Sequence, residues 1–390
     1  MDLLEYQGKQ VFAANGVAVP SGEVASDVDT AVAAADRIGY PSVIKAQVLI
    51  GGRGKAGGIK IAKDGVEARA HADAILGMDI YGPRREGPFR VHQVWVEGAS
   101  EIDAEYYASI ILDRSAKKPV LIVSRMGGMN VEEIAENDPD ALIKLHVDPI
   151  AGLDLDTARQ VAVDAQLDDD LHDEVAEVLT KLYAAFLASD ATLIEVNPLI
   201  ATSRREVVAL DAKVTLDGNA LFRHAELAAA APDDPDQDPQ EKMAKERGLT
   251  YVALDGDIGI LGNGAGLCMS TLDVVANAGG NPANFLDAGG GSKAEAIVDA
   301  LEVITSNTKV KAVLFNIFGG ITRCDEVAKG IIAAYQQVEM NVPLVVRLDG
   351  TNSEEGLRLL GEAGLSGLHH AETMLGAAEQ VVALAKGTPA

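Results

Sequence analysis

Apolar positions in the C-terminal part of the chain form short, nearly continuous runs, and helical patterns follow most of them. The expected strands cover residues 251–254, 258–261, 284–287, 310–317 and 342–348, and a last short strand lies near Leu365. Buried strands that alternate with helices of about 10–15 residues predict a parallel, doubly wound sheet. In such sheets ligands bind at the carboxyl ends of the strands, where glycines cluster in this chain.

The first 231 residues have a different pattern. Asp2 and Glu5 have the spacing of a capping box and Gly16 is a typical stop, so a helix is expected over residues 3–14. The apolar run 43–50 leads through a glycine-rich stretch into a second apolar run from Ile59, which predicts strand, loop and strand. Further strands are expected at 91–97, 107–113, 119–124, 192–197 and 206–215, and helices at 28–38, 64–76, 131–145, 157–166 and 170–188. This part is predicted to be mixed α+β with antiparallel hairpins.

A break in composition separates the two patterns. Residues 232–241 contain three prolines and five acidic residues, with no basic or large apolar residue. Such a stretch cannot bury a face, so we predict an exposed connector. The expected organisation is a first domain over 1–231, a connector over 232–245 and a second domain over 246–390. The alternative, a long surface loop inside one domain, does not account for the change of pattern on either side.

The charge of the chain limits its partners. Of 390 residues, 59 are acidic and 33 basic, which gives a net charge of 33 − 59 = −26. An acidic surface repels a phosphate backbone, so no nucleic-acid partner is expected. No apolar run reaches the roughly 18 residues of a membrane helix, and the first residues lack the basic start of a signal peptide. With only two cysteines, Cys268 and Cys324, we expect a cytoplasmic enzyme or enzyme subunit without disulfides.

The stretch 51–58 is the strongest local signal for a binding site. Its five glycines let the backbone approach a ligand, while Arg53, Lys55 and the preceding Lys45 supply positive charge. It is not a Walker loop, because Ala56 follows Lys55 and a strand follows the loop. We predict a hairpin loop that folds over the phosphates of a nucleotide; the alternative is a flexible hairpin with solvated charges.

A second group of polar residues lies on the expected strands 192–197 and 206–215. If these strands form a hairpin centred on Arg204, Asn197 lies opposite Asp211 and Glu195 lies opposite Lys213. One carboxylate and one amide oxygen suit Mg²⁺, which also takes phosphate oxygens and water. A solvent-facing hairpin with a cross-strand ion pair explains the spacing equally well.

Three glycine turns of the C-terminal part, at 262–266, 289–292 and 319–323, each open a helix. A helix N-terminus offers free N–H donors and partial positive charge, so three such turns in one sheet indicate a phosphorylated ligand. The first turn is also a poor match to a dinucleotide-binding fingerprint, because its glycine spacing is wrong.

Together these motifs resemble the β subunit of succinyl-CoA synthetase of the bacterial, ADP-forming type. The motifs that carry the resemblance are Glu5-Tyr-Gln-Gly-Lys-Gln10, 51–58, Ile194-Glu-Val-Asn-Pro-Leu199, 217–223, Tyr251-Val-Ala-Leu-Asp-Gly256, 263–266, Pro282-Ala-Asn-Phe-Leu-Asp287 and Asn316-Ile-Phe-Gly-Gly-Ile321. The resemblance implies an ATP-grasp domain over 1–231 and a flavodoxin-like CoA-ligase domain over 246–390. It also implies reversible conversion of succinate, CoA and ATP into succinyl-CoA, ADP and phosphate, as in the citric acid cycle.

The resemblance assigns roles to residues that match the motifs of the family. It implies that Glu195 orients the reacting histidine and that Asn197 and Asp211 bind one Mg²⁺ per subunit. The implied nucleotide-binding residues are Lys45, Gly52, Arg53, Gly54, Glu97, Ser100 and Glu105, and the implied substrate-binding residues are Asn263, Gly320, Ile321 and Thr322.

A partner is implied as well. In the family, the phosphoryl group passes to a histidine of an α subunit, and none of the seven histidines here lies in a glycine turn. An αβ or α2β2 assembly is therefore expected, with ATP or GTP as the nucleotide. Thr322 stands where relatives often have Val or Met, which leaves malate–CoA ligase as an alternative. A dinucleotide-binding oxidoreductase rests only on residues 262–266, and a non-catalytic scaffold leaves Lys45 and Asp211 unexplained.

Overall fold

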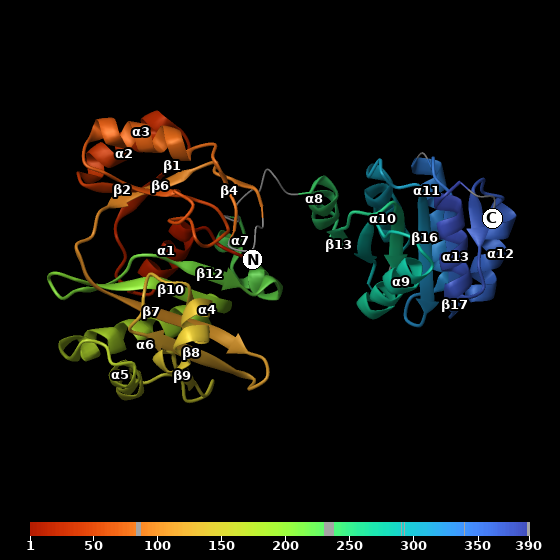
Figure 1. Cartoon of the computed structure of the whole chain (residues 1–390). Coiled ribbons are helices and arrows are strands. Elements are labelled where there is room, and N and C mark those ends of the chain that lie inside the picture. The colour runs from red at the N-terminus through yellow and green to blue at the C-terminus, as the bar shows by residue number, and fades with distance from the viewer. Residues whose placement is uncertain (83–86, 230–237, 290, 292, 339, 388–390) are drawn as a thin grey trace. The chain divides into compact units, whose positions relative to one another are not determined.

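The computed structural model of the chain (Figure 1) describes residues 1–82, 87–229, 238–289, 291, 293–338 and 340–387. The chain divides into two compact units, Met1–Asp234 and Pro235–Ala390. Within the described residues, no helix combines the length and the apolar character needed to cross a membrane.

The first unit contains two antiparallel sheets. The smaller sheet has the order β1-β6-β2-β3, and helices α2 and α3 pack on it. Its elements are β1 (Gly22–Ala25), α2 (Val28–Ile38), β2 (Ser42–Ala46), β3 (Ile59–Ala62), α3 (Gly65–Ile75) and β6 (Val94–Gly98). Asp27 and Asp64 cap the two helices by accepting hydrogen bonds from backbone N–H groups of their first turns. A separate short hairpin joins β4 (Asp79–Ile80) and β5 (Phe89–Arg90).

The larger sheet of the first unit has the order β11-β10-β7-β8-β9, with β12 also paired to β10. Its strands are β7 (Ile102–Asp113), β8 (Lys118–Ser124), β9 (Ile143–His146), β10 (Ala191–Thr202), β11 (Val207–Ala209) and β12 (Lys213–Leu216). The helices of this region are α1 (Glu5–Ala14), α4 (Val131–Asn137), α5 (Leu155–Asp164), α6 (His172–Ala188) and α7 (Ala225–Ala229), with single turns at Pro139–Ala141, Asp169–Leu171 and Gly218–Arg223. Apolar residues of α1, α5 and α6 form one core with this sheet.

Two local predictions for the first unit are wrong. The predicted capping box of Asp2 and Glu5 is absent: at the start of α1 the backbone N–H of Leu4 donates a hydrogen bond to the side-chain oxygen of Gln7 at 2.8 Å. Asp2 instead accepts a hydrogen bond from the Thr215 hydroxyl. The predicted helix 131–145 ends at Asn137, because a proline two residues later starts a separate turn, and β9 follows.

The second unit is a doubly wound sheet of order β13-β15-β14-β16-β17-β18, as predicted. Its elements are α8 (Pro239–Glu246), β13 (Thr250–Ala253), β14 (Ile258–Gly262), α9 (Ala265–Asn277), β15 (Asn284–Asp287), α10 (Ala294–Ser306), β16 (Ala312–Gly319), α11 (Cys324–Gln337), β17 (Leu344–Gly350), α12 (Ser353–Ala363), β18 (Leu368–His370) and α13 (Met374–Ala385). The strands are parallel except β13, which runs antiparallel to β15 at the edge. The expectation of an entirely parallel sheet is wrong there, because no crossover helix separates β13 from β14.

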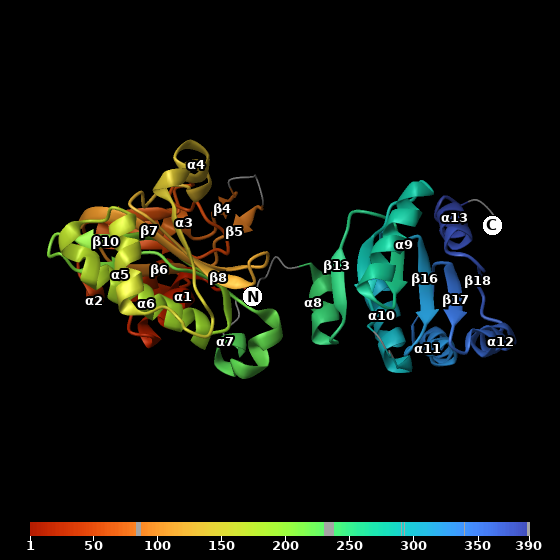
Figure 2. The same ribbon diagram turned by 90° about the horizontal axis from the view of Figure 1, so that it is seen from below.

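Helices cover both faces of this sheet, as Figure 2 shows. Phe315 and Ile317 of β16 pack with α10, α11 and α12, whereas Leu314 packs with α9 and α13 on the other face. Successive strand residues therefore enter opposite cores, which explains why the strands are apolar without alternation.

The connector predicted over 232–245 differs from the structure in its second half. Residues 232–237 lie outside the described residues. From Pro239 the chain forms α8, which Asp238 caps by accepting hydrogen bonds from the N–H groups of Gln240 and Glu241. Ala244 of this helix is buried in the core of the second unit. Residues 239–245 are therefore part of that unit and not linker.

Candidate functional site

Lys45 lies on β2, a strand whose residues are all buried, and its ammonium group is surrounded by acceptors. Its Nζ lies 2.9 Å from Glu5 Oε1 and 2.6 Å from Glu97 Oε1, and it donates to the carbonyl of Leu210 at 2.9 Å. An ammonium group has three N–H donors, so these three acceptors satisfy it. The side chain is therefore held in one position at the end of the strand.

Arg53 enters the same region from the glycine-rich loop. Its Nη1 lies 2.6 Å from Glu5 Oε2 and donates to the carbonyl of Ala46, while Nη2 lies 2.8 Å from Asp211 Oδ1. The guanidinium group is buried, with 7% of the side chain exposed. Arg53 thus joins α1 to the segment that precedes β12, and the predicted phosphate-binding cation and metal-binding carboxylate lie side by side.

A third cation, Lys9, completes the cluster. Its Nζ lies 2.8 Å from Glu5 Oε1 and 2.5 Å from Glu97 Oε2, and Trp95 Nε1–H also donates to Glu97 Oε2. We call the set Glu5, Lys9, Lys45, Arg53, Glu97 and Asp211 the buried ion network. Its three positive and three negative groups balance, which is what allows so many charges to be buried together.

Sequence reasoning did not find Lys9, nor the role of Glu5. Both lie within the quoted motif 5–10, and their spacing of four residues places them on one face of α1. That spacing indicates that Glu5 and Lys9 can interact. It does not identify Glu97, the second partner of Lys9, which lies 88 residues further along the chain than Lys9.

The electrostatic state of Glu5 follows from its neighbours. Burial alone raises the pKa of a carboxyl group, but Arg53, Lys45 and Lys9 outweigh burial and hold the pKa of Glu5 well below its ordinary value of 4.5. Burial lowers the pKa of Lys45, and the negative charges of Glu5 and Glu97 outweigh it and raise that pKa above its ordinary value. Glu5 and Lys45 are therefore both charged at neutral pH.

The hairpin register predicted from the sequence is confirmed where the structure pairs the strands. Glu195 lies opposite Lys213 and Leu199 opposite Ala209. In both pairs the two residue numbers add up to 408. The same register places Asn197 opposite Asp211, between these pairs. The Arg53 guanidinium and the Ala212 N–H both reach Oδ1 of Asp211, whose side chain is 33% exposed. Asn197 and Asp211, the two predicted metal ligands, therefore occupy opposite positions in the register of β10 and the segment that precedes β12.

Glu195 is placed on β10, where Tyr107 donates a hydrogen bond to its Oε2 at 3.3 Å. Burial raises the pKa of Glu195, and the positive charge of Lys213 opposes this effect. A carboxyl group in such surroundings can accept a proton or a cationic hydrogen-bond donor more readily than an exposed one.

The remaining residues predicted to bind nucleotide have different surroundings. The side chain of Glu97 is fully buried against Lys9, Lys45 and Trp95. Ser100 is half-buried between β6 and β7, and Glu105 is exposed on β7. In the glycine loop, Gly52 has a φ of +78°, and Lys55 is exposed with its Nζ 3.9 Å from Glu133 Oε1.

In the second unit, the three glycine turns meet at the carboxyl edge of the sheet. The side-chain amide of Asn263 donates to the carbonyl of Phe318 and accepts from its N–H. The N–H of Gly291 donates to the Thr322 hydroxyl at 2.9 Å. The turns after β14, β15 and β16 are therefore linked. Ile321 is 86% exposed, whereas Thr322 is buried.

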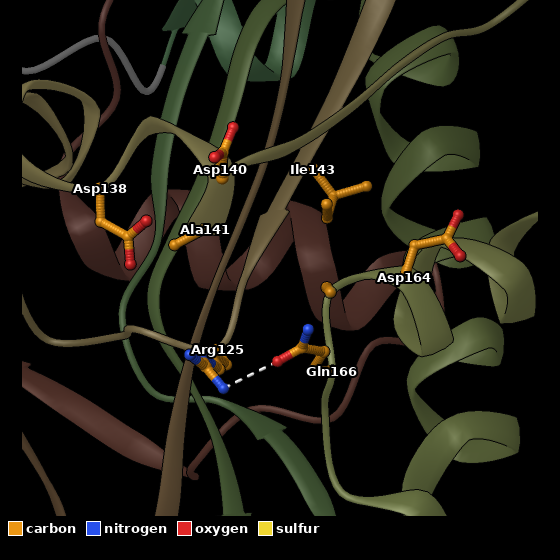
Figure 3. A pocket seen from close by; sticks show the side chains of 8 residues that line it. Arg125, Asp138, Asp140, Ala141, Ile143, Asp164 and Gln166 are labelled. Carbon is orange, nitrogen blue, oxygen red and sulfur yellow. Dashed lines mark hydrogen bonds between the residues drawn. The ribbon is translucent and has the colours of Figure 1, made fainter.

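A small cavity of about 140 Å³ in the first unit contains none of the predicted site residues (Figure 3). It is lined by Arg125, Asp138, Asp140, Ala141, Ile143, Asp164, Ala165 and Gln166. Arg125 points toward Gln166 and donates to its Oε1 at 2.9 Å. Three aspartates against one arginine disfavour an anionic ligand here.

We predict that Glu5→Gln destabilises the first unit strongly. The substitution leaves three buried cations facing only two carboxylates, and breaking a buried pair in this way costs about 3–5 kcal/mol. Urea unfolding at pH 7 measures the change. The matched control is Glu23→Gln, which removes an exposed pair with Arg37 and should change the free energy of unfolding little.

The same variant tests the charge state of Glu5. Because its folded pKa is lowered, the stability it contributes is complete above pH 4.5 and is lost as the pH falls toward the lower folded pKa. The difference in unfolding free energy between wild type and Glu5→Gln should therefore shrink below pH 4.5. A difference that stays constant from pH 7 to pH 3 would contradict this role.

Comparison with known proteins agrees with the two-unit architecture. The family model described as ATP-grasp domain matches residues 2–201, and the model described as CoA-ligase matches residues 261–381. The chain is similar in fold to the ATP citrate lyase from Methanothrix soehngenii, with a TM-score of 0.76, 21% sequence identity and 99% of each chain covered. At that identity the likeness concerns the fold alone.

Closer relatives share the whole chain. A protein of Rubrobacter xylanophilus is 50% identical over 99% of both chains, and one of Natronomonas pharaonis is 52% identical over 92% of this chain and 93% of its own. A third, of Bordetella petrii, is 45% identical over 99% of this chain and all of its own. All three are named succinate–CoA ligase [ADP-forming] subunit beta. The chain therefore belongs to the family of succinate–CoA ligase β subunits, with an ATP-grasp unit followed by a CoA-ligase unit.

Proposed function

We propose that this chain is the nucleotide-binding subunit of an enzyme that joins succinate to CoA at the expense of ATP and releases ADP and phosphate. The observation that carries the proposal is the convergence of Lys45, Arg53 and Asp211 at one end of β2 in the ATP-grasp unit. The names of the relatives, which specify ADP formation, favour ATP over GTP.

In this proposal, Lys45 and the loop residues Gly52, Arg53 and Gly54 hold the phosphates of the nucleotide. Both cations are already desolvated and oriented, so binding costs them little further ordering. All three donors of Lys45 are engaged, so a phosphate oxygen would replace one of its acceptors. Glycines with positive φ let the loop backbone turn its N–H groups toward the phosphates.

The adenosine part of the nucleotide lies along the segment from Glu97 through Ser100 to Glu105. Because the carboxylate of Glu97 is buried in the ion network, this residue contributes through its backbone. Ser100 and Glu105 offer a hydroxyl and an exposed carboxylate for the ribose.

Asn197 and Asp211 fit a magnesium ion. Both offer oxygen, the ligand that Mg²⁺ prefers, and the hairpin register places them at opposite positions between the pairs Glu195–Lys213 and Leu199–Ala209. In the described part of the chain, no cluster of three or more His, Cys, Asp or Glu is arranged for a metal, so water and phosphate oxygens complete the coordination. The bound ion would neutralise the charge of the phosphates.

Phosphoryl transfer requires a nucleophile; the described residues of the site include no histidine, and we assign this role to a histidine of an α subunit. Glu195, half-buried beside Tyr107, would orient that histidine and stabilise its positive charge. An αβ or α2β2 assembly follows. The unpaired, buried Cys268 and Cys324 suit the cytoplasm.

The glycine turns of the second unit would receive the carboxylate or acyl phosphate together with the α subunit. Asn263, Gly320, Ile321 and Thr322 belong to these linked turns. The Thr322 hydroxyl is buried and accepts from Gly291 N–H, so it does not favour a hydroxylated acid. No observation therefore supports malate over succinate.

The reaction is tested with this chain co-purified with its α subunit. We expect continuous, multiple-turnover ADP release that requires CoA and succinate together, beyond the single equivalent that phosphorylation of the α subunit releases, and much slower turnover when malate replaces succinate. An absence of CoA-dependent turnover with both acids would contradict the proposed function, and faster turnover with malate would change the substrate.

The metal site is tested by Asp211→Asn in the same complex. We expect transfer of the γ-phosphate of ATP to the α subunit to fall by at least about 100-fold, because losing a ligand costs at least as much as losing a supporting contact. Labelled phosphate on the α subunit measures the transfer. The control Asp29→Asn, which removes an exposed pair with Arg69, should behave as wild type, and unchanged transfer in Asp211→Asn would remove this residue from the site.

A further inference from the structure

The loop Met126–Asn130, between β8 and α4, lies directly against β7 at Glu105. The N–H of Gly127 donates to the carbonyl of Glu105 at 3.0 Å. A Cβ on Gly127 would lie 2.4 Å from the carbonyl oxygen of Tyr106, and a Cβ on Gly128 would lie 2.4 Å from Glu105 Oε2. Gly128 also has a φ of +69°. Gly127 is therefore what allows the loop backbone to approach the strand so closely, while Gly128 supplies the positive φ of the turn.

The same loop holds both ends of the Asn197 side-chain amide. Gly128 N–H donates to Asn197 Oδ1 at 2.8 Å, and Asn197 Nδ2 donates to the carbonyl of Met129 at 2.8 Å. A backbone N–H requires an acceptor and a carbonyl requires a donor, so only one orientation of the amide satisfies both contacts. The loop thus fixes which way the oxygen of Asn197 points.

The segment that follows reaches the glycine-rich loop 51–58. Glu133, in the first turn of α4, lies 3.9 Å from Lys55 of that loop. Residues 126–133 therefore contact Glu105, which is proposed to bind the ribose, and Asn197, which is proposed to bind the metal. They also approach the loop 51–58, which is proposed to bind the phosphates. None of the sequence motifs quoted above includes this segment.

We propose that the loop Met126–Asn130 is a positioning element of the nucleotide and metal site, which holds the amide of Asn197 in the orientation needed to bind the metal. The inference rests on the proposed function, in which Asn197 and Asp211 share a magnesium ion. A carbonyl oxygen has two lone pairs, so Asn197 Oδ1 can accept from Gly128 and still bind a cation. Contacts that orient a metal ligand typically contribute 10–100-fold in metal affinity.

The test is the metal dependence of nucleotide binding in the complex with the α subunit. The affinity for β,γ-methylene-ATP is measured by calorimetry with Mg²⁺ and with EDTA, and the ratio of the two affinities gives the metal enhancement. In Gly127→Ala the added Cβ would lie 2.4 Å from the Tyr106 carbonyl oxygen and 2.5 Å from its nitrogen, so the loop must move away from β7 and we expect this enhancement to fall at least about tenfold. The matched control is Gly361→Ala on α12, which has no atom within 4 Å of the added Cβ, and its enhancement should equal that of wild type.

Equal enhancement in wild type and Gly127→Ala would overturn the inference and leave the metal site standing. No enhancement in wild type would instead remove the metal site, and this inference with it. A second variant, Asn197→Asp, covers the case in which Gly127→Ala does not fold. It keeps an oxygen ligand but cannot donate to Met129, so we expect lower enhancement; a carboxylate free to turn would give equal or higher enhancement and contradict the role of the loop.

Discussion

The packing of one carboxylate, Glu5, against three cations is the interaction on which the first unit depends. Glu5 lies on α1, which packs with the larger sheet, whereas Lys45 and Arg53 come from β2 and the glycine loop of the smaller sheet. The ion network therefore ties together two sheets that have separate apolar cores. Because an unpaired buried charge is costly, each member of the network keeps the others in place.

This arrangement explains how a chain with a net charge of −26 can bind a polyphosphate. The cations that would meet the phosphates are already inside the protein and are balanced by Glu5, Glu97 and Asp211. The acidic surface does not compete for them. The phosphate oxygens of a nucleotide would replace some of these carboxylates as acceptors for the cations. A metal ion bound at Asp211 would then balance the negative charge of this carboxylate, which Arg53 now contacts.

Much of the fold and part of the site follow from the sequence, for identifiable reasons. The strands of the second unit are buried on both faces, so they appear as apolar runs, and the hairpin register follows from the turn near Arg204. The prediction from the sequence was wrong at residues 143–146, where the local pattern fits both a helix and a strand. Leu142 and Leu145 have the spacing of a helix face, whereas Ile143 and Leu145 alternate as in a strand, and only the pairing of β9 with β8 decides between them.

The long-range contacts of the site could not be predicted from spacing. Lys9 meets Glu97 across 88 residues, and Gly128 meets Asn197 across 69. The local sequence around each residue does not identify its partner, because each residue taken alone fits a surface position or a turn. The fold brings them together, and the buried charges then require partners of opposite sign.

The central claim is that Glu5 holds Arg53 in position for the phosphates. A double-mutant cycle of Glu5→Gln and Arg53→Met, read as ATP affinity in folded complexes with the α subunit, tests it most directly. The account predicts that the double variant loses less affinity than the two single losses combined, with a coupling of at least about 1 kcal/mol. Losses that add within about 0.5 kcal/mol would contradict it.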